Sequence, residues 1–133
     1  LTRGNGRDSL ARKNLARKKP MIKIVIFVKR KIGMSFEEFD KYWRDEHAPL
    51  IKRVTEFSRH VRKYVQSHRL TGDVPLAAEA DYDGVAELWF DSVDAMTTAF
   101  AEPRYMELIR PDELKFLELH RCLSIVCDEF EVI

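Results

Sequence analysis

The chain has 133 residues, of which 45% are hydrophobic and 34% are charged, and its formal net charge is +1. This length fits one globular domain, and the hydrophobic share excludes a wholly disordered chain. The longest apolar run, Ile24–Val28, is far shorter than the ~20 residues that a membrane-spanning helix needs, so we expect no membrane partner.

The charge is unevenly distributed along the chain. Residues 1–20 contain seven Lys or Arg residues and one acid, a net charge of +6, whereas the remainder carries −5. The acidic body argues against a nucleic-acid partner, because such proteins carry basic residues on their folded surface. Residues 1–20 lack the apolar core of a secretory signal. We expect them to be a basic N-terminal extension, either a leader or an upstream stretch of the gene model, followed by one domain over 21–133.

The first half of the expected domain begins with a strand and a long helix. Apolar residues at alternate positions over Ile22–Val28 predict a strand that is apolar on both faces. Ser35 and Glu38 form a capping box that starts a helix. Its apolar stripe comprises Phe36, Phe39, Trp43, His47, Leu50, Val54 and Phe57. Pro49 predicts a kink, or two consecutive helices, near His47 and Ala48.

The second half continues with strands, helices and a polar loop. In chain order we expect a strand over His60–Leu70, a loop over Thr71–Asp83, a strand over Val85–Phe90, a helix from Asp91 or Ser92 to a break at Pro103, a short helix from Pro111 to Leu117 and a strand over Cys122–Val132.

This β-α-β-β-α-β order predicts an α+β, ferredoxin-like fold, with a four-stranded antiparallel sheet and both helical segments on one face. The first, third and last strands are apolar on both faces, so the uncovered face needs a partner. We expect a homodimer whose two sheets meet face to face as a dimeric α+β barrel.

The two cysteines, Cys122 and Cys127, are five residues apart in one predicted strand, which places them on opposite faces. They are therefore poorly placed to bond to each other, and no residue at zinc-like spacing accompanies them. We expect reduced thiols and a cytoplasmic location.

His47 is the most distinctive candidate for chemistry. It lies on the apolar stripe and therefore points between helix and sheet, and its ordinary pKa of ~6.5 suits proton transfer near neutrality. The alternative is a core histidine that is hydrogen-bonded to a backbone carbonyl at the kink.

Other candidates have an ordinary structural explanation beside the functional one. Glu87 alternates with Val85 and Trp89 on a half-buried strand face and needs a partner there. Asp112 follows Pro111 at a helix start, where an N-cap role fits the spacing best. Tyr64 packs across strands or offers a phenol to a ligand. For the larger aromatic residues, core packing is the ordinary role and a ligand-binding wall is the alternative: Trp43, Trp89, Phe39, Phe100 and Phe116.

The sequence lacks the motifs of several enzyme classes. It contains no G-x-G-x-x-G, no phosphate-binding G-x-x-x-x-G-K loop, no G-x-S-x-G elbow and no H-E-x-x-H. Its four histidines have no metal-site spacing. We therefore expect neither a metal nor another cofactor.

Four segments from 39 onward resemble the EthD family of dimeric α+β barrel proteins. They are F-x-x-Y-W-x-x-x-H-x-P-L over 39–50, R-K-Y ending at Tyr64, Y-D-G-V-A-E-L-W-F-D-S over 82–92 and P-D-E-x-x-F-L over 111–117. The third string is highly specific. The resemblance covers residues 21–133 in the expected order, and residues 1–20 have no counterpart in the family.

The family is named for a protein linked to ether degradation, and similar barrels include isomerases, polyketide cyclases, dehydratases and cofactor-free monooxygenases. The resemblance implies a small hydrophobic ligand between sheet and helices. His47 matches the helix-borne histidine of the family. Five further residues match recurrent family positions: Trp43, Tyr64, Glu87, Trp89 and Asp112.

Our first hypothesis is therefore a cofactor-free enzyme of small-molecule catabolism or secondary metabolism, which isomerises, dehydrates or oxidises its substrate. His47 would be the general acid or base, Tyr64 would polarise a substrate oxygen, and Glu87 or Asp112 would orient the imidazole. The pocket walls would come from Trp43, Trp89, Phe39 and Phe116.

The second hypothesis is a non-catalytic ligand-binding or accessory protein of an oxygenase-linked degradation pathway, and a third is a structural dimer without a cavity. An enzyme should place at least two hydrogen-bonding groups beside His47 around one cavity, whereas a carrier needs only an apolar lining.

Overall fold

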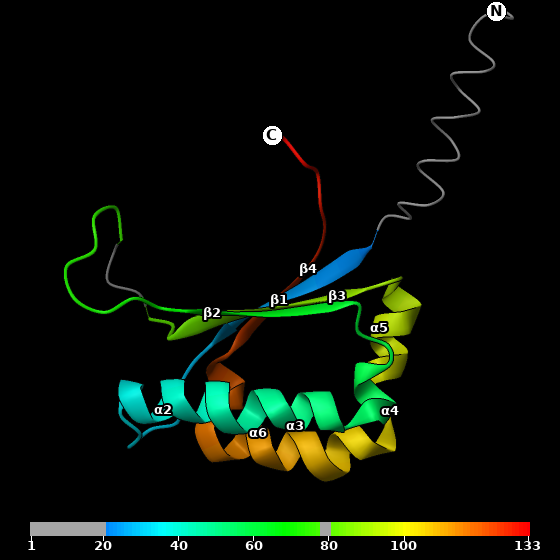
Figure 1. The fold of residues 1–133 in the computed structure, drawn as a ribbon, viewed down its shortest axis with the longest axis horizontal. Helices are drawn as coiled ribbons and strands as arrows, with labels where there is room; N and C mark the ends of the chain where they lie inside the picture. The colour runs from blue at the N-terminus through cyan, green and yellow to red at the C-terminus, as the bar shows by residue number, and fades with distance from the viewer. Residues whose placement is uncertain (1–20, 78–80) are drawn as a thin grey trace, which may run out of the picture.

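The computed structural model describes residues 21–77 and 81–133, as one sheet with a layer of helices against it (Figure 1). The predicted extension over 1–20 lies outside these residues. The elements in chain order are β1 (Ile22–Val28), α2 (Phe36–Tyr42), η2 (Trp43–His47), α3 (Ala48–Arg53), α4 (Thr55–Ser58), β2 (Lys63–His68), β3 (Gly84–Phe90), α5 (Val93–Phe100), η3 (Tyr105–Ile109), α6 (Arg110–Phe116), η4 (Leu119–Arg121) and β4 (Leu123–Asp128). The predicted β-α-β-β-α-β order is confirmed.

Two strands are shorter than predicted. β2 begins at Lys63, because the backbone N–H groups of His60 and Val61 donate to carbonyls of the preceding helical segment. β4 ends at Asp128, which pairs with Ile22, the first residue of β1. The ladder of β4 therefore ends where its partner strand begins.

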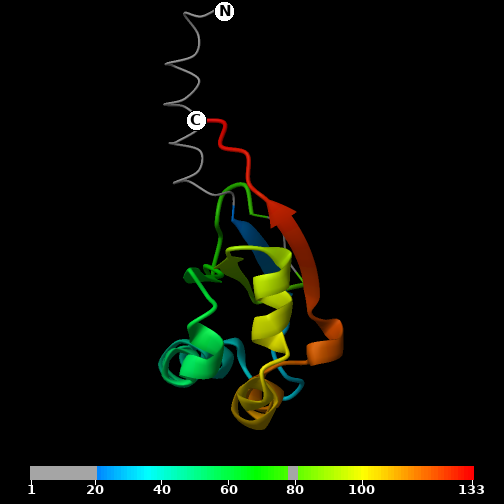
Figure 2. The same cartoon turned by 90° about the vertical axis from the view of Figure 1, so that its right-hand side faces the viewer.

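The four strands form an antiparallel sheet in the order β2-β3-β1-β4, the ferredoxin-like arrangement. The helices lie on one side of the sheet in both views (Figure 1 and Figure 2). On the helix side, β1 contributes Ile24, which lies opposite Leu88 of β3. On the other side, which we call the open face, Val25 lies opposite Glu87 and Ile125. The register thus decides which side chains can meet the helices.

Two π turns interrupt the helix layer, and each ends two residues before a proline. η2 closes with a hydrogen bond from the N–H of Ala48, before Pro49, and η3 with one from Arg110, before Pro111, each to the carbonyl five residues earlier. A proline has no N–H, and its ring clashes with the carbonyl four residues earlier in a regular helix, so the wider turn relieves the conflict. The kink predicted near His47 is therefore a π turn.

The core lies between the sheet and the helices and is rich in aromatic side chains. Phe39, which follows the predicted capping box of α2, packs on Trp43 and Phe116 with ring-centroid distances of 5.4 and 5.9 Å. Burying side chains of this size stabilises the fold by roughly 1.5–3 kcal/mol each. Within the described ranges, no helix is long and apolar enough to cross a bilayer.

Candidate functional site

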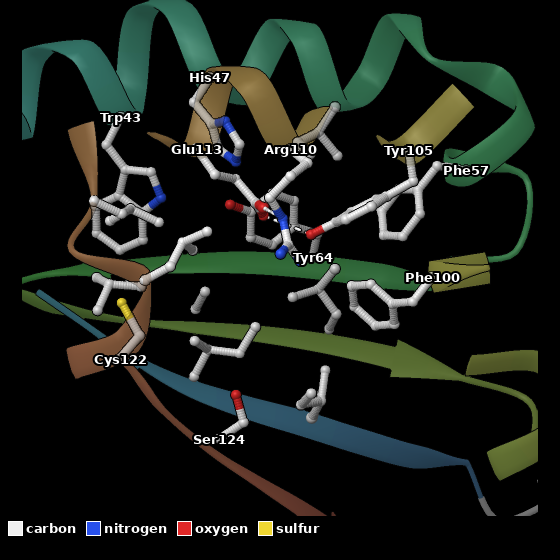
Figure 3. Close-up of a pocket in the computed structure, with 18 residues that line it drawn as sticks. Trp43, His47, Phe57, Tyr64, Phe100, Tyr105, Arg110, Glu113, Cys122 and Ser124 are labelled. Atoms are coloured by element: carbon white, nitrogen blue, oxygen red, sulfur yellow. Dashed lines mark hydrogen bonds and ion pairs between the residues drawn. The ribbon is translucent and has the colours of Figure 1, made fainter. Parts of the chain in front are cut away.

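A cavity of about 310 Å³ lies between the sheet and the helix layer (Figure 3). Its volume is at the small end of the range for ligand pockets, about 300–1,000 Å³. Most of its wall is apolar, with a few polar groups placed among the hydrocarbon side chains. It is lined by Ile24, Ile26, Val28, Trp43, His47, Ile51, Phe57, Tyr64, Ala86, Leu88, Phe100, Tyr105, Arg110, Glu113, Leu117, Leu119, Cys122 and Ser124.

His47, the last residue of η2, lies in the cavity wall and is only 5% exposed. Its Nδ1 lies 2.8 Å from Oδ2 of Asp112, a residue of α6 that is 8% exposed. The Tyr42 hydroxyl donates to the other carboxylate oxygen of Asp112, and burial together with this contact raises the pKa of Tyr42. The ring of Phe116 lies 4.8 Å from the imidazole and fixes its orientation. The imidazole is therefore held on one edge by a buried carboxylate.

Two of the structural explanations offered from sequence are wrong. The partner of His47 is the carboxylate of Asp112 and not a backbone carbonyl at the kink. Asp112 does not cap its helix, because α6 begins at Arg110 and Asp112 lies in its first turn. The carboxylate points across to α2 and η2 instead, where it accepts hydrogen bonds from Tyr42 and His47.

The tautomer of His47 follows from this contact. A carboxylate can only accept, so Nδ1 carries the proton that is shared with Asp112, and in the uncharged form of the ring Nε2 has a free lone pair. Figure 3 shows the ring of His47 pointing from its helix towards the cavity. The site therefore presents a basic nitrogen to whatever the cavity holds.

Trp43 and Tyr64 form further parts of the wall. Trp43 is 1% exposed, and its ring packs so tightly on Gly84 that a Cβ there would lie 2.5 Å from its Cζ3 atom. This contact explains why glycine opens β3. The Tyr64 hydroxyl accepts a hydrogen bond from Gln66 Nε2 at 3.2 Å, and burial raises the pKa of Tyr64. Tyr64 therefore brings a neutral phenol to the cavity.

A second polar group, which the sequence reasoning missed, lies in the same wall. Glu113 of α6 accepts a hydrogen bond from the Tyr105 hydroxyl at 2.5 Å and another from Arg110 Nε at 2.8 Å. Burial and the nearby carboxylate raise the pKa of Tyr105. The signal in the sequence was weak, since Glu113 follows Asp112 in a helix where acids are usually solvated. Only a helical projection of α6 onto the core would have indicated it.

Asp112 contacts His47 without lining the cavity itself, and four other candidate residues also lie outside the cavity wall. Glu87 and Trp89 are on the open face, where Lys23 forms an ion pair with Glu87 at 2.7 Å and lies over the Trp89 ring at 5.2 Å. Phe39 and Phe116 are fully buried behind the wall, and support Trp43 and His47 respectively. The structure thus brings together Trp43, His47, Tyr64 and Asp112, and separates Glu87 and Trp89 from them.

Cys122 and Cys127 are both free thiols. Cys122 lines the cavity, and burial raises its pKa, whereas Cys127 pairs with Lys23 in the ladder and lies on the open face. Among the residues that the structure describes, no group of three or more His, Cys, Asp or Glu side chains is placed to hold a metal ion.

Two fungal proteins are similar in sequence to most of the chain. The chain is 29% identical over 101 residues to the conidial pigment biosynthesis dehydratase EthD of Metarhizium robertsii, which covers 69% of this chain and 70% of the relative. It is also 29% identical over 105 residues to the dehydratase ustZ of Ustilaginoidea virens, with 73% and 75% covered.

Solved structures share the fold at low sequence identity. An EthD-family protein from Bacillus halodurans superposes with a TM-score of 0.62 at 16% identity, covering 83% of this chain and 99% of that one. A dimeric protein with a ferredoxin-like fold from Bacteroides fragilis superposes with a TM-score of 0.58 at 12% identity, covering 82% and 96%. These structural similarities agree with the observed α+β fold. The model of the EthD domain matches residues 31–120, a range that includes both His47 and Asp112. The chain therefore belongs to the EthD family.

Proposed function

We propose that this protein is an enzyme that removes water from a small hydrophobic carbonyl or aromatic compound, by acid–base chemistry without a cofactor. The observation that carries this proposal is the buried His47–Asp112 pair at 2.8 Å, with the His47 ring pointing towards the cavity (Figure 3). The names of the two fungal relatives favour dehydration over isomerisation or oxidation, the other reactions expected for such a fold.

In the first step, Nε2 of His47 takes a proton from the carbon next to the substrate carbonyl. Asp112 stabilises the imidazolium that forms, and a positioned base of this kind contributes about 10²–10⁴-fold to the rate. Negative charge develops on the carbonyl oxygen. Because the Tyr64 oxygen accepts from Gln66, its own proton is available to donate to that oxygen and to stabilise the enolate.

In the second step, the electron pair of the enolate forms the new carbon–carbon double bond and expels the hydroxyl from the neighbouring carbon. The imidazolium of His47 returns its proton to the departing oxygen, and water leaves. One C–H and one C–O bond are broken, one double bond is formed, and the base is regenerated. The reaction therefore needs no oxidant or reductant.

The lining of the cavity supports an enzyme more than a carrier. A carrier of an apolar compound needs only hydrocarbon walls, and polar groups there reduce its affinity because they lose water on binding. Two phenols, Tyr64 and Tyr105, line the same cavity as His47, together with the pair of Arg110 and Glu113. Such convergence of polar groups in an apolar pocket is typical of a reactive site.

A hydroxytetralone with its hydroxyl β to the ketone tests the proposal, because loss of water gives a naphthol with a distinct absorbance. His47→Asn should lower kcat by about 10²–10⁴-fold and leave the circular dichroism spectrum unchanged. His120→Asn is the matched control, since its ring is exposed and lies outside the cavity wall, and it should keep the wild-type rate. An undiminished rate in His47→Asn would refute the base, and binding without any turnover by the wild type would favour an accessory protein.

We further propose that the protein forms a homodimer through the open face of the sheet. Leu123 and Ile125 of β4 lie there with 51% and 49% of their surface exposed, next to Val25 and Phe27 of β1. An apolar sheet face of this kind is stabilised by a second copy related by two-fold symmetry. The dimeric state of the structurally similar Bacteroides fragilis protein supports the same arrangement.

A further inference from the structure

We propose that Glu113 makes the cavity selective for uncharged ligands, so that the substrate is a neutral hydroxylated ketone and not a carboxylate. This inference rests on the proposed function, because it names the substrate class of the same cavity. It is carried by two contacts in the cavity wall: Arg110 Nε donates to Glu113, and His47 Nδ1 lies against Asp112.

Arg110 and Glu113 are the basic and the acidic side chain among the described residues of the wall, apart from His47. A guanidinium in an apolar cavity ordinarily attracts a carboxylate ligand, which it binds through two parallel hydrogen bonds. Here Nε of Arg110 already donates to Glu113 at 2.8 Å, and the Glu113 side chain is 14% exposed while that of Arg110, at the mouth of the cavity, is 40% exposed. The two opposite charges largely cancel for any third group in the cavity.

At the histidine end of the cavity, a positive charge on His47 would likewise be offset by a neighbouring carboxylate. When His47 becomes an imidazolium, Asp112 is the carboxylate that faces it, at 2.8 Å. A ligand carboxylate would therefore meet one cation, Arg110, that already has an anionic partner, and at His47 a ring whose charged form would face Asp112. It would lose its hydration without gaining an ion pair, which makes its binding unfavourable.

Tyr105 adds the group that recognises a neutral hydroxyl. Its proton is donated to Glu113, and burial keeps its pKa raised, so it remains a phenol. The lone pairs of its oxygen can accept a hydrogen bond from a ligand hydroxyl, and the terminal N–H groups of Arg110 can donate to the same hydroxyl oxygen. A hydroxyl group, which both donates and accepts, matches this end better than a carboxylate does.

The test compares para-hydroxyacetophenone with para-hydroxybenzoate, which share the ring and the hydroxyl and differ in the charge of the second substituent. Isothermal titration calorimetry on the full chain at neutral pH gives the two dissociation constants without any turnover. We expect the ketone to bind at least about tenfold more tightly to the wild type. Glu113→Gln leaves Arg110 without its anionic partner, so the benzoate should gain about tenfold in affinity or more.

Two further variants separate charge selection from a structural role. Glu107→Gln removes an exposed acid that pairs with Arg104 outside the cavity, and it should keep the wild-type ratio. Arg110→Gln combined with Glu113→Gln restores a neutral wall and should restore the preference for the ketone, even if Glu113→Gln alone folds poorly.

Equal binding of the two compounds by the wild type, failure of the ketone to bind, or an unchanged ratio in Glu113→Gln would overturn the inference. Its failure is distinguishable from that of the proposed function. A protein that prefers the ketone but never removes water from a β-hydroxyketone would refute only the dehydration, whereas a dehydratase with no charge preference would refute only the role of Glu113.

Discussion

The contact between Gly84 and Trp43 yields a prediction that does not depend on the identity of the substrate. Gly84 opens β3, and the Trp43 ring lies directly over its backbone. A Cβ at this position would lie 2.5 Å from Trp43 Cζ3 on one side and 2.9 Å from the carbonyl oxygen of Ser67 on the other. Gly84→Ala should therefore disturb both the fold and the cavity wall.

The size of the destabilisation follows from the overlap between the added Cβ and its neighbours. Carbon atoms in contact are ordinarily about 3.5–4.0 Å apart, so the ring must move by about 1 Å. Trp43 is held between the rings of Phe39 and His68, with centroid distances of 5.4 and 4.5 Å, and the Ser67 oxygen belongs to the backbone of the paired strand. We expect Gly84→Ala to lower the free energy of unfolding by about 2–3 kcal/mol, the upper part of the usual range for overpacking.

Urea unfolding measures this loss, and a double-mutant cycle assigns it to the ring. Trp43→Phe should relieve part of the clash, which gives a coupling energy of about 0.5–3 kcal/mol with Gly84→Ala. Gly33→Ala is the control, because Gly33 has a φ of +88° and nothing within 4 Å of its added Cβ. Its cost comes from the backbone alone, so it should be additive with Trp43→Phe. A loss below about 0.5 kcal/mol for Gly84→Ala, or a coupling of zero, would refute the steric reasoning.

Three further predictions test the site and the assembly. Asp112→Asn removes a charge-assisted hydrogen bond worth about 1.5–3 kcal/mol, so steady-state kinetics should show kcat reduced by about 10–100-fold with little change in KM. Burial and Glu113 raise the pKa of Tyr105 above that of the unfolded chain, so stability should fall as the pH rises above about 10, and Tyr105→Phe should flatten this fall in urea unfolding across alkaline pH. Ile125→Lys on the open face should give a monomer in analytical ultracentrifugation, whereas Ile32→Lys in an exposed turn should leave the dimer intact.

The histidine on the apolar stripe illustrates how far sequence periodicity reaches. Steps of three and four residues placed His47 between helix and sheet, and the structure places it there with 5% of its surface exposed. Its partner was harder to predict. Asp112 looked like a helix cap because acids at helix starts usually cap, and only the packing of α6 against η2 turns its carboxylate towards the imidazole.

For the third strand, β3, sequence periodicity could not predict which side chains face the helices. β3 alternates Val85, Glu87 and Trp89 with Ala86 and Leu88, so periodicity separates the two sets without saying which set meets the helices. The register of the sheet places Ala86 and Leu88 in the cavity and the other three on the open face. A strand that is apolar on both sides carries no local signal for this choice.

Local features of this protein were thus determined by its sequence alone: the strand and helix order, the capping box and the kink that Pro49 imposes. These depend on atoms within a few residues of one another, where propensity and steric rules apply directly. Tertiary structure alone decided the composition of the site, because it joins His47 to Asp112 across 65 residues and brings Tyr105, Arg110 and Glu113 into one wall. Which distant groups meet depends on how whole helices pack on the sheet, and residue patterns along the chain do not carry that information.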